Sequence, residues 1–333
     1  MLKRDIEAIL DSGNLSGFRG NTEGHSGGYW VQVLEESFKE YFNIKYAVAM
    51  NSATACLHAA CVACGLTYGD DVLVTPYSFV SSVSCLNMVN ANEVFADIDE
   101  DTFNITKFSL LREWQTSWFS ATIPVHLMGH PCDLDELKSV IFEHGYIIED
   151  AAQAIGAKYK GKLVGTIGDC GIFSFNQSKQ ISCGEGGMLI TNNSRIARIA
   201  RAMRNHGEVS DPMLRIVGYN YRMGEIEARI VIEQFKYLDE NLTIRQELAE
   251  YMTEKLSQIE GLVPPVVKDY CTRHAWYTYG VKWQRKDMTR DQFQKEMMRR
   301  GVFFGSGYVK PIHLLPIYNN SEGLCPVAER MWK

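Results

Sequence analysis

Short apolar runs alternate with longer amphipathic stretches between residues 45 and 192. The apolar runs have the length of buried strands and lie at 46–50, 71–75, 94–97, 121–125, 146–150, 171–175 and 187–191. Stretches with a helical period lie between several of them, for example at 53–65 and 134–144. Strands that alternate with helices predict an α/β fold in which helices cover a mostly parallel sheet.

A different pattern begins near Gly224. Residues 224 to about 260 are rich in Glu, Gln, Leu and Lys, which predicts a long helical region that ends at Gly261 and the following prolines. Beyond it, the sequence indicates a smaller α/β unit, with a strand-like run at 276–282, a helix near 290–300 and an apolar run at 302–304. We therefore expect a large domain over 1–238 and a small domain over 239–333.

Composition and charge exclude several classes of protein. The net charge is −6 without a long run of Lys or Arg, so we expect no nucleic-acid binding. No apolar signal core follows Met1, and no run approaches the ~20 apolar residues that span a bilayer. We expect a cytoplasmic protein that binds no membrane and keeps its nine cysteines reduced.

Known motifs for metals and nucleotides are missing from the sequence. Cys61 and Cys64 form a C-x-x-C pair inside an apolar helical run, and no second pair follows at zinc-site spacing. The eight histidines lack an H-E-x-x-H spacing, so we predict no metal site. The dinucleotide motif G-x-G-x-x-G after the first strand and the P-loop motif are also absent.

An acidic segment follows the apolar run at 146–148. It places Asp150 at the carboxyl end of a strand, where ligands gather in sheets of this kind. A carboxylate there can keep a pyridine nitrogen protonated, and Gln153 can reach a ring substituent from the same side. The alternative is that Asp150 caps a following helix, and this segment alone does not separate the two interpretations.

A lysine lies between a predicted strand and a glycine-rich loop. Lys179 has mostly apolar or hydroxyl-bearing neighbours, and a partly desolvated lysine suits Schiff-base formation and proton transfer. Ser174, five residues earlier, can donate to a phosphate, and the glycines at 184–187 allow close approach of the backbone. The alternative is an exposed loop lysine beside a hairpin, which its position between two strands makes less favourable.

Two further segments follow predicted strands. Small and hydroxyl residues at 51–55 begin a helix, whose free N–H groups suit a phosphate, although an ordinary N-cap fits as well. Phe79 lies in the segment 76–82 and can stack on a flat cofactor ring. An aromatic residue in a core loop is the alternative.

In this order, the segments resemble the DegT–DnrJ–StrS family of sugar aminotransferases from about Leu15 to Arg330. The matching segments are Leu15-Ser-Gly-Phe-Arg-Gly20, Ser52-Ala-Thr54, Pro76-Tyr-Ser-Phe79, Phe95-Ala-Asp-Ile-Asp99, Pro124-Val-His-Leu127, Glu149-Asp-Ala-Ala-Gln153, Phe173-Ser-Phe175, Lys179, Gly184-Glu-Gly-Gly187, Arg204-Asn-His-Gly207 and Gly218-Tyr-Asn-Tyr-Arg-Met223. The resemblance implies pyridoxal 5'-phosphate (PLP) as cofactor and fold type I, with a mostly parallel seven-stranded sheet in the large domain.

The resemblance also assigns roles to residues. It implies that Lys179 forms the Schiff base and moves the proton, that Asp150 pairs with the pyridine nitrogen, and that Gln153 contacts the ring hydroxyl. Phe79 would stack on the ring. The implied phosphate ligands are Thr54, Ala55 and Ser174.

Three more residues gain roles from the family. Asn220 matches an asparagine that completes the phosphate site of the partner subunit, which implies a homodimer with its active sites at the interface. Arg222 would lie near the substrate across that interface, and His313 matches a region near the sugar.

The sequence departs from the family in two places. The usual Ser-Gly-Thr reads Ser52-Ala53-Thr54, which leaves a phosphate role intact because backbone groups carry it. The chain stops at Lys333, where family members usually continue through a final helix and strand, so the resemblance implies a truncated or reduced small domain.

The implied reaction is amino transfer from glutamate or glutamine to a keto-sugar attached to a nucleotide. One alternative is a keto-cyclitol of the inosose type, because Gln177-Ser178-Lys179 is similar to that branch too. Dehydratases of the family carry histidine instead of the lysine, so Lys179 argues against them. Intact Lys179, Asp150 and Gln153 argue against a non-catalytic binding or regulatory protein.

Overall fold

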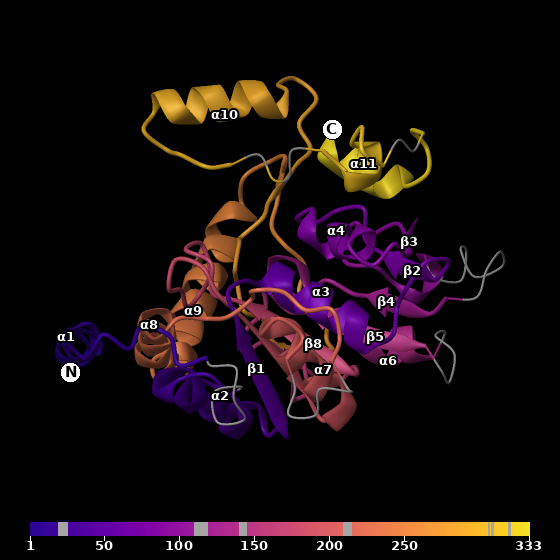
Figure 1. The fold of residues 1–333 in the computed structure, drawn as a ribbon. Helices are drawn as coiled ribbons and strands as arrows, with labels where there is room; N and C mark the ends of the chain where they lie inside the picture. The colour runs from indigo at the N-terminus through magenta and orange to yellow at the C-terminus, as the bar shows by residue number, and fades with distance from the viewer. Residues whose placement is uncertain are drawn as a thin grey trace.

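A seven-stranded sheet forms the centre of the computed structural model, which describes residues 1–18, 26–109, 119–139, 145–208, 215–305, 307, 310–318 and 321–333 (Figure 1). The strand order is β1-β9-β8-β5-β4-β2-β3. Only β9 runs antiparallel to its neighbours in this sheet, so the predicted mostly parallel α/β sheet is confirmed. The strands are β1 (Tyr46–Met50), β2 (Asp71–Val74), β3 (Asn92–Phe95), β4 (Ala121–Ile123), β5 (Tyr146–Asp150), β8 (Cys170–Ser174) and β9 (Gly187–Thr191).

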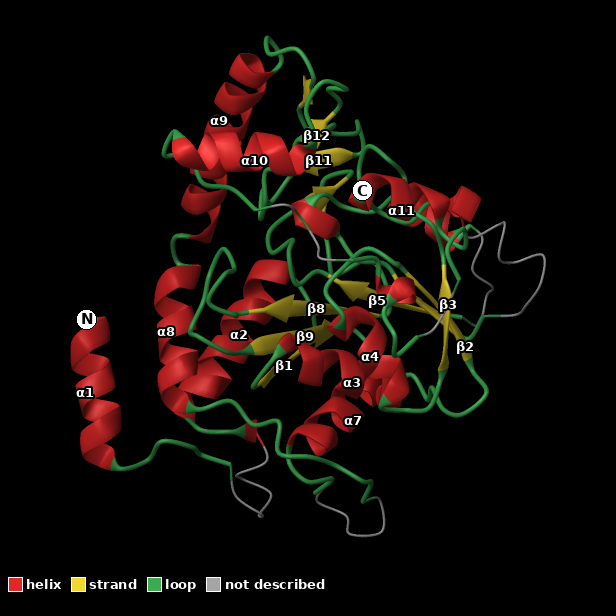
Figure 2. Ribbon diagram, turned by 90° about the horizontal axis from the view of Figure 1, so that it is seen from above, coloured by secondary structure: helices red, strands yellow, loops and turns green. Residues whose placement is uncertain are grey.

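Alternate residues of the strands face two hydrophobic cores on opposite sides of the sheet. In β1, Val48 and Met50 belong to one core, and Ala47 and Ala49 belong to the other. The first core lies under α3 (Ala53–Ala63), α4 (Ser81–Asn87) and α7 (Ser194–Arg204). The second lies under α2 (Tyr29–Phe42) and α8 (Glu225–Phe235), and α1 (Leu2–Ser12) packs on α8 (Figure 2).

The long helical region predicted over 224–260 is two helices. α8 ends at Phe235, and α9 (Leu238–Leu256) begins after a break at Tyr237, whose ψ of 11° is not helical. No glycine or proline marks this break in the sequence. The cause is tertiary packing, because Leu238 and Leu242 anchor the start of α9 in the second core and the rest of α9 then rises away from the sheet (Figure 1).

The C-terminal part differs from the prediction in its strands. The helix predicted near 290–300 is present as α10 (Arg290–Arg299), but the runs at 276–281 and 302–304 are irregular. Residues 275–278 form hydrogen bonds with Met128 and Gly129 instead of with a strand. The short strands are β10 (Leu262–Val263) with β12 (Lys282–Trp283), and β11 (Cys271–Arg273) with β6 (Lys158–Tyr159) and β7 (Lys162–Leu163).

The last described segment returns to the large sheet. Asp97, just after β3, accepts hydrogen bonds from the N–H groups of Val327 and Ala328 at the start of α11 (Pro326–Trp332). These bonds attach α11 to the end of β3.

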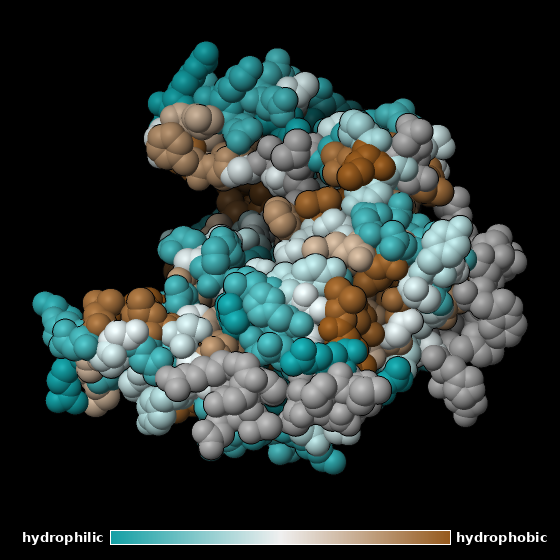
Figure 3. Space-filling model, in the orientation of Figure 1, coloured by the Kyte–Doolittle hydropathy of each residue, from teal (hydrophilic) through white to brown (hydrophobic). Residues whose placement is uncertain are grey.

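In the space-filling view, a deep hollow separates the part that holds α10 from the body below it (Figure 3). In the described part of the chain, no helix is both long enough and apolar enough to cross a bilayer. The remaining short elements are α6 (Leu134–Lys138) and the 3-10 turns η2 (Leu127–Gly129) and η4 (Ile312–Leu314). Residues 140–144 of the predicted helix at 134–144 lie outside the described ranges.

A buried ion pair ties α2 to α7. The guanidinium of Arg204 is completely buried and donates to the carboxylate of Glu35 and to the carbonyl of Ala49, 3.0 Å away. Glu35 also accepts a hydrogen bond from the N–H of Ala49 (2.9 Å), which fixes the position of β1. Loss of Glu35 would therefore leave the charge of Arg204 buried without its carboxylate.

We expect Glu35→Ala to lower the free energy of unfolding by about 3–5 kcal/mol, because Arg204 would remain buried without its carboxylate. Urea unfolding followed by circular dichroism measures this loss. Glu36→Ala is the matched control, since Glu36 is exposed and pairs with Lys39 at the surface, where a pair contributes about 0–1 kcal/mol. Similar losses in both variants would contradict the prediction.

Candidate active site

Strand register brings the predicted site residues to one edge of the sheet. Asp150 ends β5 and pairs with Ile172 of β8. Ser174 ends β8 and pairs with Gly187, which in turn pairs with Met50 at the end of β1. Asp150, Ser174 and the start of α3 therefore lie along the same edge, as expected for a ligand site in such a sheet.

The start of α3 packs directly on β9. A Cβ atom at Gly187 would lie 2.5 Å from the backbone N of Ala53, so this approach requires glycine. Ser52 is the N-cap, and its hydroxyl accepts a hydrogen bond from the N–H of Ala55 (3.1 Å), so the N-cap interpretation is confirmed. Thr54 is half-buried in the first turn. A helix N-terminus also attracts anions, so the cap leaves the phosphate prediction open.

Asp150 is a buried carboxylate without a salt-bridged cation among the described residues. One oxygen accepts from Ser82 Oγ (2.7 Å) and the other from the N–H of Ala152 (3.1 Å). Burial raises the pKa of Asp150, while these hydrogen bonds and the charge of Lys179 oppose the rise. Residues 151–157 form turns, so the alternative that Asp150 caps a following helix is wrong.

Ser82 is a site residue that the sequence analysis did not identify. It lies on α4, donates to Asp150, and its hydroxyl is 3.1 Å from that of Ser78. Phe79, between these two serines, has 62% of its surface exposed, so it is not a core aromatic residue. The segment 76–82 was singled out for its aromatic ring, and the spacing of its serines was the missed signal.

Lys179 lies in the turn after β8, and its amine contacts an aromatic ring. Its Nζ is 4.1 Å from the centroid of the Tyr277 ring. The Tyr277 hydroxyl is 3.1 Å from Ser178 Oγ. Among the described carboxylates, none lies within ion-pair distance of this amine. Tyr277, nearly a hundred residues away in sequence, carried no signal that could have placed it here.

Gln153 is buried and held in one orientation. Its Oε1 accepts a hydrogen bond from the N–H of Met128 (2.8 Å), and its carbonyl accepts from Gln180 (2.9 Å). Met128 has a positive φ of 56°, an uncommon conformation for a residue with a side chain, which aims its N–H at Gln153. These contacts fix the side chain and backbone of Gln153 three residues after Asp150.

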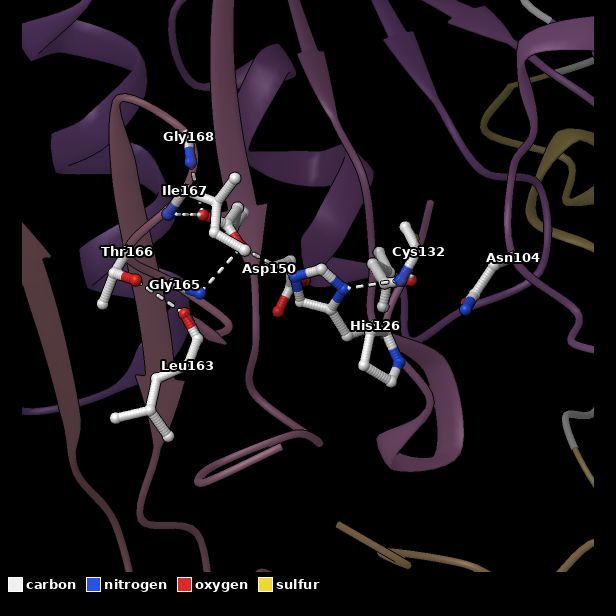
Figure 4. A network of polar contacts seen from close by, with 12 residues as sticks. Asn104, His126, Cys132, Asp150, Leu163, Gly165, Thr166, Ile167 and Gly168 are labelled. Carbon is white, nitrogen blue, oxygen red and sulfur yellow. Dashed lines mark hydrogen bonds and ion pairs between the residues drawn. The ribbon is translucent and has the colours of Figure 1, made fainter. Parts of the chain in front are cut away.

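Glu149 and His126 form a fully buried pair behind Asp150. His126 Nδ1 accepts from the N–H of Cys132 (2.9 Å), so Nε2 carries the proton and donates to Glu149 (3.0 Å). Glu149 also accepts N–H bonds from Gly165 (2.7 Å), Ile167 (2.7 Å) and Gly168, and the surrounding network is shown in Figure 4. Burial acts to raise the pKa of Glu149, but the bonds from His126 and the backbone outweigh it and lower the pKa.

The three residues with implied partner or substrate roles lie in different settings. Asn220 is exposed, and its carbonyl accepts from Asn51 Nδ2 (3.2 Å), next to the start of α3. Arg222 donates to Asn205 (3.2 Å). His313 is completely buried and donates to Glu329 (2.9 Å), so its substrate role stays a prediction without exposed ring surface to support it. Arg19 and Gly20 of the first matching segment lie outside the described residues.

The groups at this edge fit PLP chemically. The lysine amine can bond to the cofactor, and the buried carboxylate can pair with its pyridine nitrogen. The exposed aromatic ring can stack on the cofactor ring, and the helix N-terminus can bind its phosphate. Asp150 is the most specific of these, because among the described residues its buried carboxylate forms no ion pair, and a protonated ring nitrogen would supply one.

Comparison with known proteins gives a consistent class. The GDP-perosamine synthase of Caulobacter vibrioides is 36% identical over 297 residues, which cover 87% of this chain and 79% of that protein. The spore coat polysaccharide biosynthesis protein SpsC of Bacillus subtilis is 34% identical over 313 residues, which cover 88% and 79%. The aminotransferase structure from Psychrobacter cryohalolentis matches with a TM-score of 0.88 and 31% identity, covering 99% of this chain and 89% of that one.

The fold and site therefore define a PLP-dependent aminotransferase of fold type I. Residues 16–333 match the profile of the DegT/DnrJ/EryC1/StrS aminotransferase family, and the chain belongs to that family.

His130 lies in the same loop as Met128 and is buried as a neutral ring. Its Nδ1 donates to the carbonyl of Pro131 (2.8 Å), and its Nε2 accepts from the N–H of Lys268 (3.1 Å). Burial lowers the pKa of His130 from 6.5 to about 4. The folded state therefore binds this proton later than the unfolded chain does as pH falls.

We expect the free energy of unfolding to be unaffected by His130 above pH 6.5 and to fall as the pH drops from 6.5 towards about 4. The lowered pKa corresponds to a loss of about 3 kcal/mol of unfolding free energy, because the histidine binds a proton in the unfolded chain but stays neutral in the folded protein. Urea unfolding at several pH values measures the slope. His130→Asn keeps a donor for Pro131 but does not titrate, so its slope should be smaller. Equal slopes would contradict the prediction.

Proposed function

We propose that this enzyme transfers an amino group from glutamate or glutamine to a keto-sugar attached to a nucleotide, in the cytoplasm. The observation that carries the proposal is the lysine amine of Lys179 beside the buried carboxylate of Asp150 at the carboxyl end of the sheet. Two relatives support the substrate class. One is named GDP-perosamine synthase, and the structure of DesI, 27% identical with a TM-score of 0.88, was determined in the presence of its TDP-sugar product.

The residues divide the work of holding the cofactor. Bound PLP supplies an electron sink that stabilises negative charge on the carbon beside the amino group. Asp150, which accepts a hydrogen bond from Ser82, would hold the proton on the ring nitrogen, and Gln153, which accepts from the N–H of Met128, would contact the ring hydroxyl. Phe79 would cover the ring, and Thr54, Ala55 and Ser174 at the sheet edge would bind the phosphate.

Lys179 does the proton transfer. Its amine would hold the cofactor in the resting enzyme and, when released, would accept and return the proton of the carbon beside the amino group. The flexible side chain of lysine suits both positions. In the first half-reaction the donor gives up its amino group, and in the second the keto-sugar receives it.

The active unit in this proposal is a homodimer, the commonest symmetric assembly. Asn220 lies in an exposed segment with Val217 and Tyr219, whose side chains are 80% and 40% exposed. Such a segment suits contact with a second copy. Asn220 would then complete the phosphate site of the partner, and Arg222 would face the partner's substrate. The proposed division of each subunit, 1–238 and 239–333, falls at the start of α9.

The keto-cyclitol alternative has less support. It rests on Gln177-Ser178-Lys179, and the relatives described above are named for sugar or polysaccharide products. A role without catalysis is not favoured, because Lys179, Asp150 and Gln153 are all present and lie together.

We expect purified protein with PLP to show a visible absorption band that moves to the near ultraviolet when glutamate or glutamine is added. Lys179→Ala should remove the band and slow the first half-reaction by at least about a thousand-fold, because both the bond and the proton carrier are lost. Lys160→Ala, which removes an exposed lysine, is the control and should behave as wild type. A band that neither donor moves would rule out transamination, and the absence of a band would rule out PLP binding.

Subunit mixing tests the shared site. Asn220→Ala should weaken PLP binding by about ten-fold or more, since a hydrogen bond to a charged group contributes about 1.5–3 kcal/mol. Co-expressed Lys179→Ala and Asn220→Ala subunits should recover about a quarter of the wild-type activity at limiting PLP, since half the dimers are mixed and each holds one intact site. No recovery would mean that Asn220 serves its own subunit.

A further inference from the structure

We propose that Tyr277 holds the amine of Lys179 whenever that amine is not joined to the cofactor, which makes Tyr277 a positioning residue of the reaction. The inference rests on the proposed function and deepens it. It concerns Lys179 as a free amine.

The contact between the two side chains is a cation–π interaction. Lys179 Nζ lies 4.1 Å from the centroid of the Tyr277 ring, well inside the ~6 Å range of such contacts. Both residues are half-buried, so water only partly screens the attraction. With no described carboxylate at ion-pair distance, the aromatic face is the contact that holds the free amine.

The ring of Tyr277 is held in place by contacts that do not involve Lys179. The N–H of Tyr277 donates to the carbonyl of Met128 (3.0 Å), and the Tyr277 hydroxyl contacts Ser178 Oγ (3.1 Å). Gly129 makes this approach possible, because a Cβ there would lie 2.8 Å from the backbone N of Trp276.

Trp276 fixes the same segment from the other side. Its φ is +43°, its ring stacks on His274 at 3.8 Å, and its Nε1 donates to Gln246 of α9 (2.6 Å). The strained backbone is held by these contacts on both sides. Tyr277 is therefore a rigid surface, and the four-carbon side chain of Lys179 is the part that moves.

The location of the contact determines its effect on the reaction. A donor amine that displaced Lys179 from the cofactor would exchange one C=N bond for another and release the lysine as an amine, without net oxidation. Tyr277 then stabilises the released amine at a defined place near Asp150. Because the contact stabilises the free amine, it favours release of the lysine and opposes its bond to PLP by the same free energy.

The test compares two ligands of the protein prepared without cofactor. PLP joins Lys179, whereas pyridoxamine phosphate has an amine in place of the aldehyde and leaves the lysine free. Dissociation constants for both are measured by absorbance and fluorescence titration. We expect Tyr277→Leu to tighten PLP relative to pyridoxamine phosphate by about two- to five-fold, the equivalent of a partly exposed cation–π contact.

Three variants separate this effect from structural damage. Tyr277→Phe keeps the ring and should keep the wild-type ratio of the two constants. Tyr279→Leu removes a tyrosine of the same segment that contacts Thr253 of α9, and it should leave the ratio unchanged. Tyr277→Met is a second substitution without a ring, for use if Tyr277→Leu does not fold.

The outcomes are distinct. Equal weakening of both ligands in the variants without a ring would assign Tyr277 a structural role and overturn the proposal. An unchanged ratio would also overturn it while leaving the proposed function intact, provided that wild-type protein captures PLP. Failure of the wild-type protein to capture PLP would overturn both.

Discussion

The carboxylate of Asp150, buried at the end of β5, is the constraint on which the rest of the site depends. A buried charge is costly unless it is hydrogen-bonded and paired. Ser82 and the N–H of Ala152 donate to its oxygens, and among the described residues no cation forms an ion pair with it. Glu149, the preceding residue, faces the other side of the strand, and its oxygens are satisfied within the protein by hydrogen bonds from His126 and from the N–H groups of Gly165, Ile167 and Gly168. Two adjacent acidic residues thus have different chemistry because alternate strand positions face different surroundings.

The loop that carries Met128 connects this carboxylate site to the C-terminal part of the chain. Its backbone N–H holds Gln153, and its carbonyl holds Tyr277. Positive φ angles at Met128 and Trp276 are tolerated because hydrogen bonds and stacking on both sides determine them. Through its bond to Gln246, Trp276 also connects α9 to the segment that carries Tyr277.

The local sequence pattern predicted secondary structure correctly where a residue and its immediate neighbours determine the conformation. The strands at 46–50, 146–150 and 187–191 have the predicted bounds, because short apolar runs between polar residues are buried as strands wherever they lie in the sheet. The break at Tyr237 and the irregular course of residues 276–281 were not predictable, because packing against distant segments decides both. The buried pair of His313 and Glu329 is a further case, since neither residue shows its partner in sequence.

By itself, the sequence determined the α/β class, the family resemblance, and the placement of Asp150 at the end of a strand and of Lys179 after one, because strand length, apolar character and motif order are local properties of the chain. The tertiary structure alone decided which side chains surround these two residues. Ser82 contacts Asp150 and Tyr277 contacts Lys179, each from a segment far away in sequence. These contacts depend on the strand order, on the missing side chain at Gly129 and on backbone hydrogen bonds between loops. Such contacts form only when the whole core has packed, so no local pattern records them.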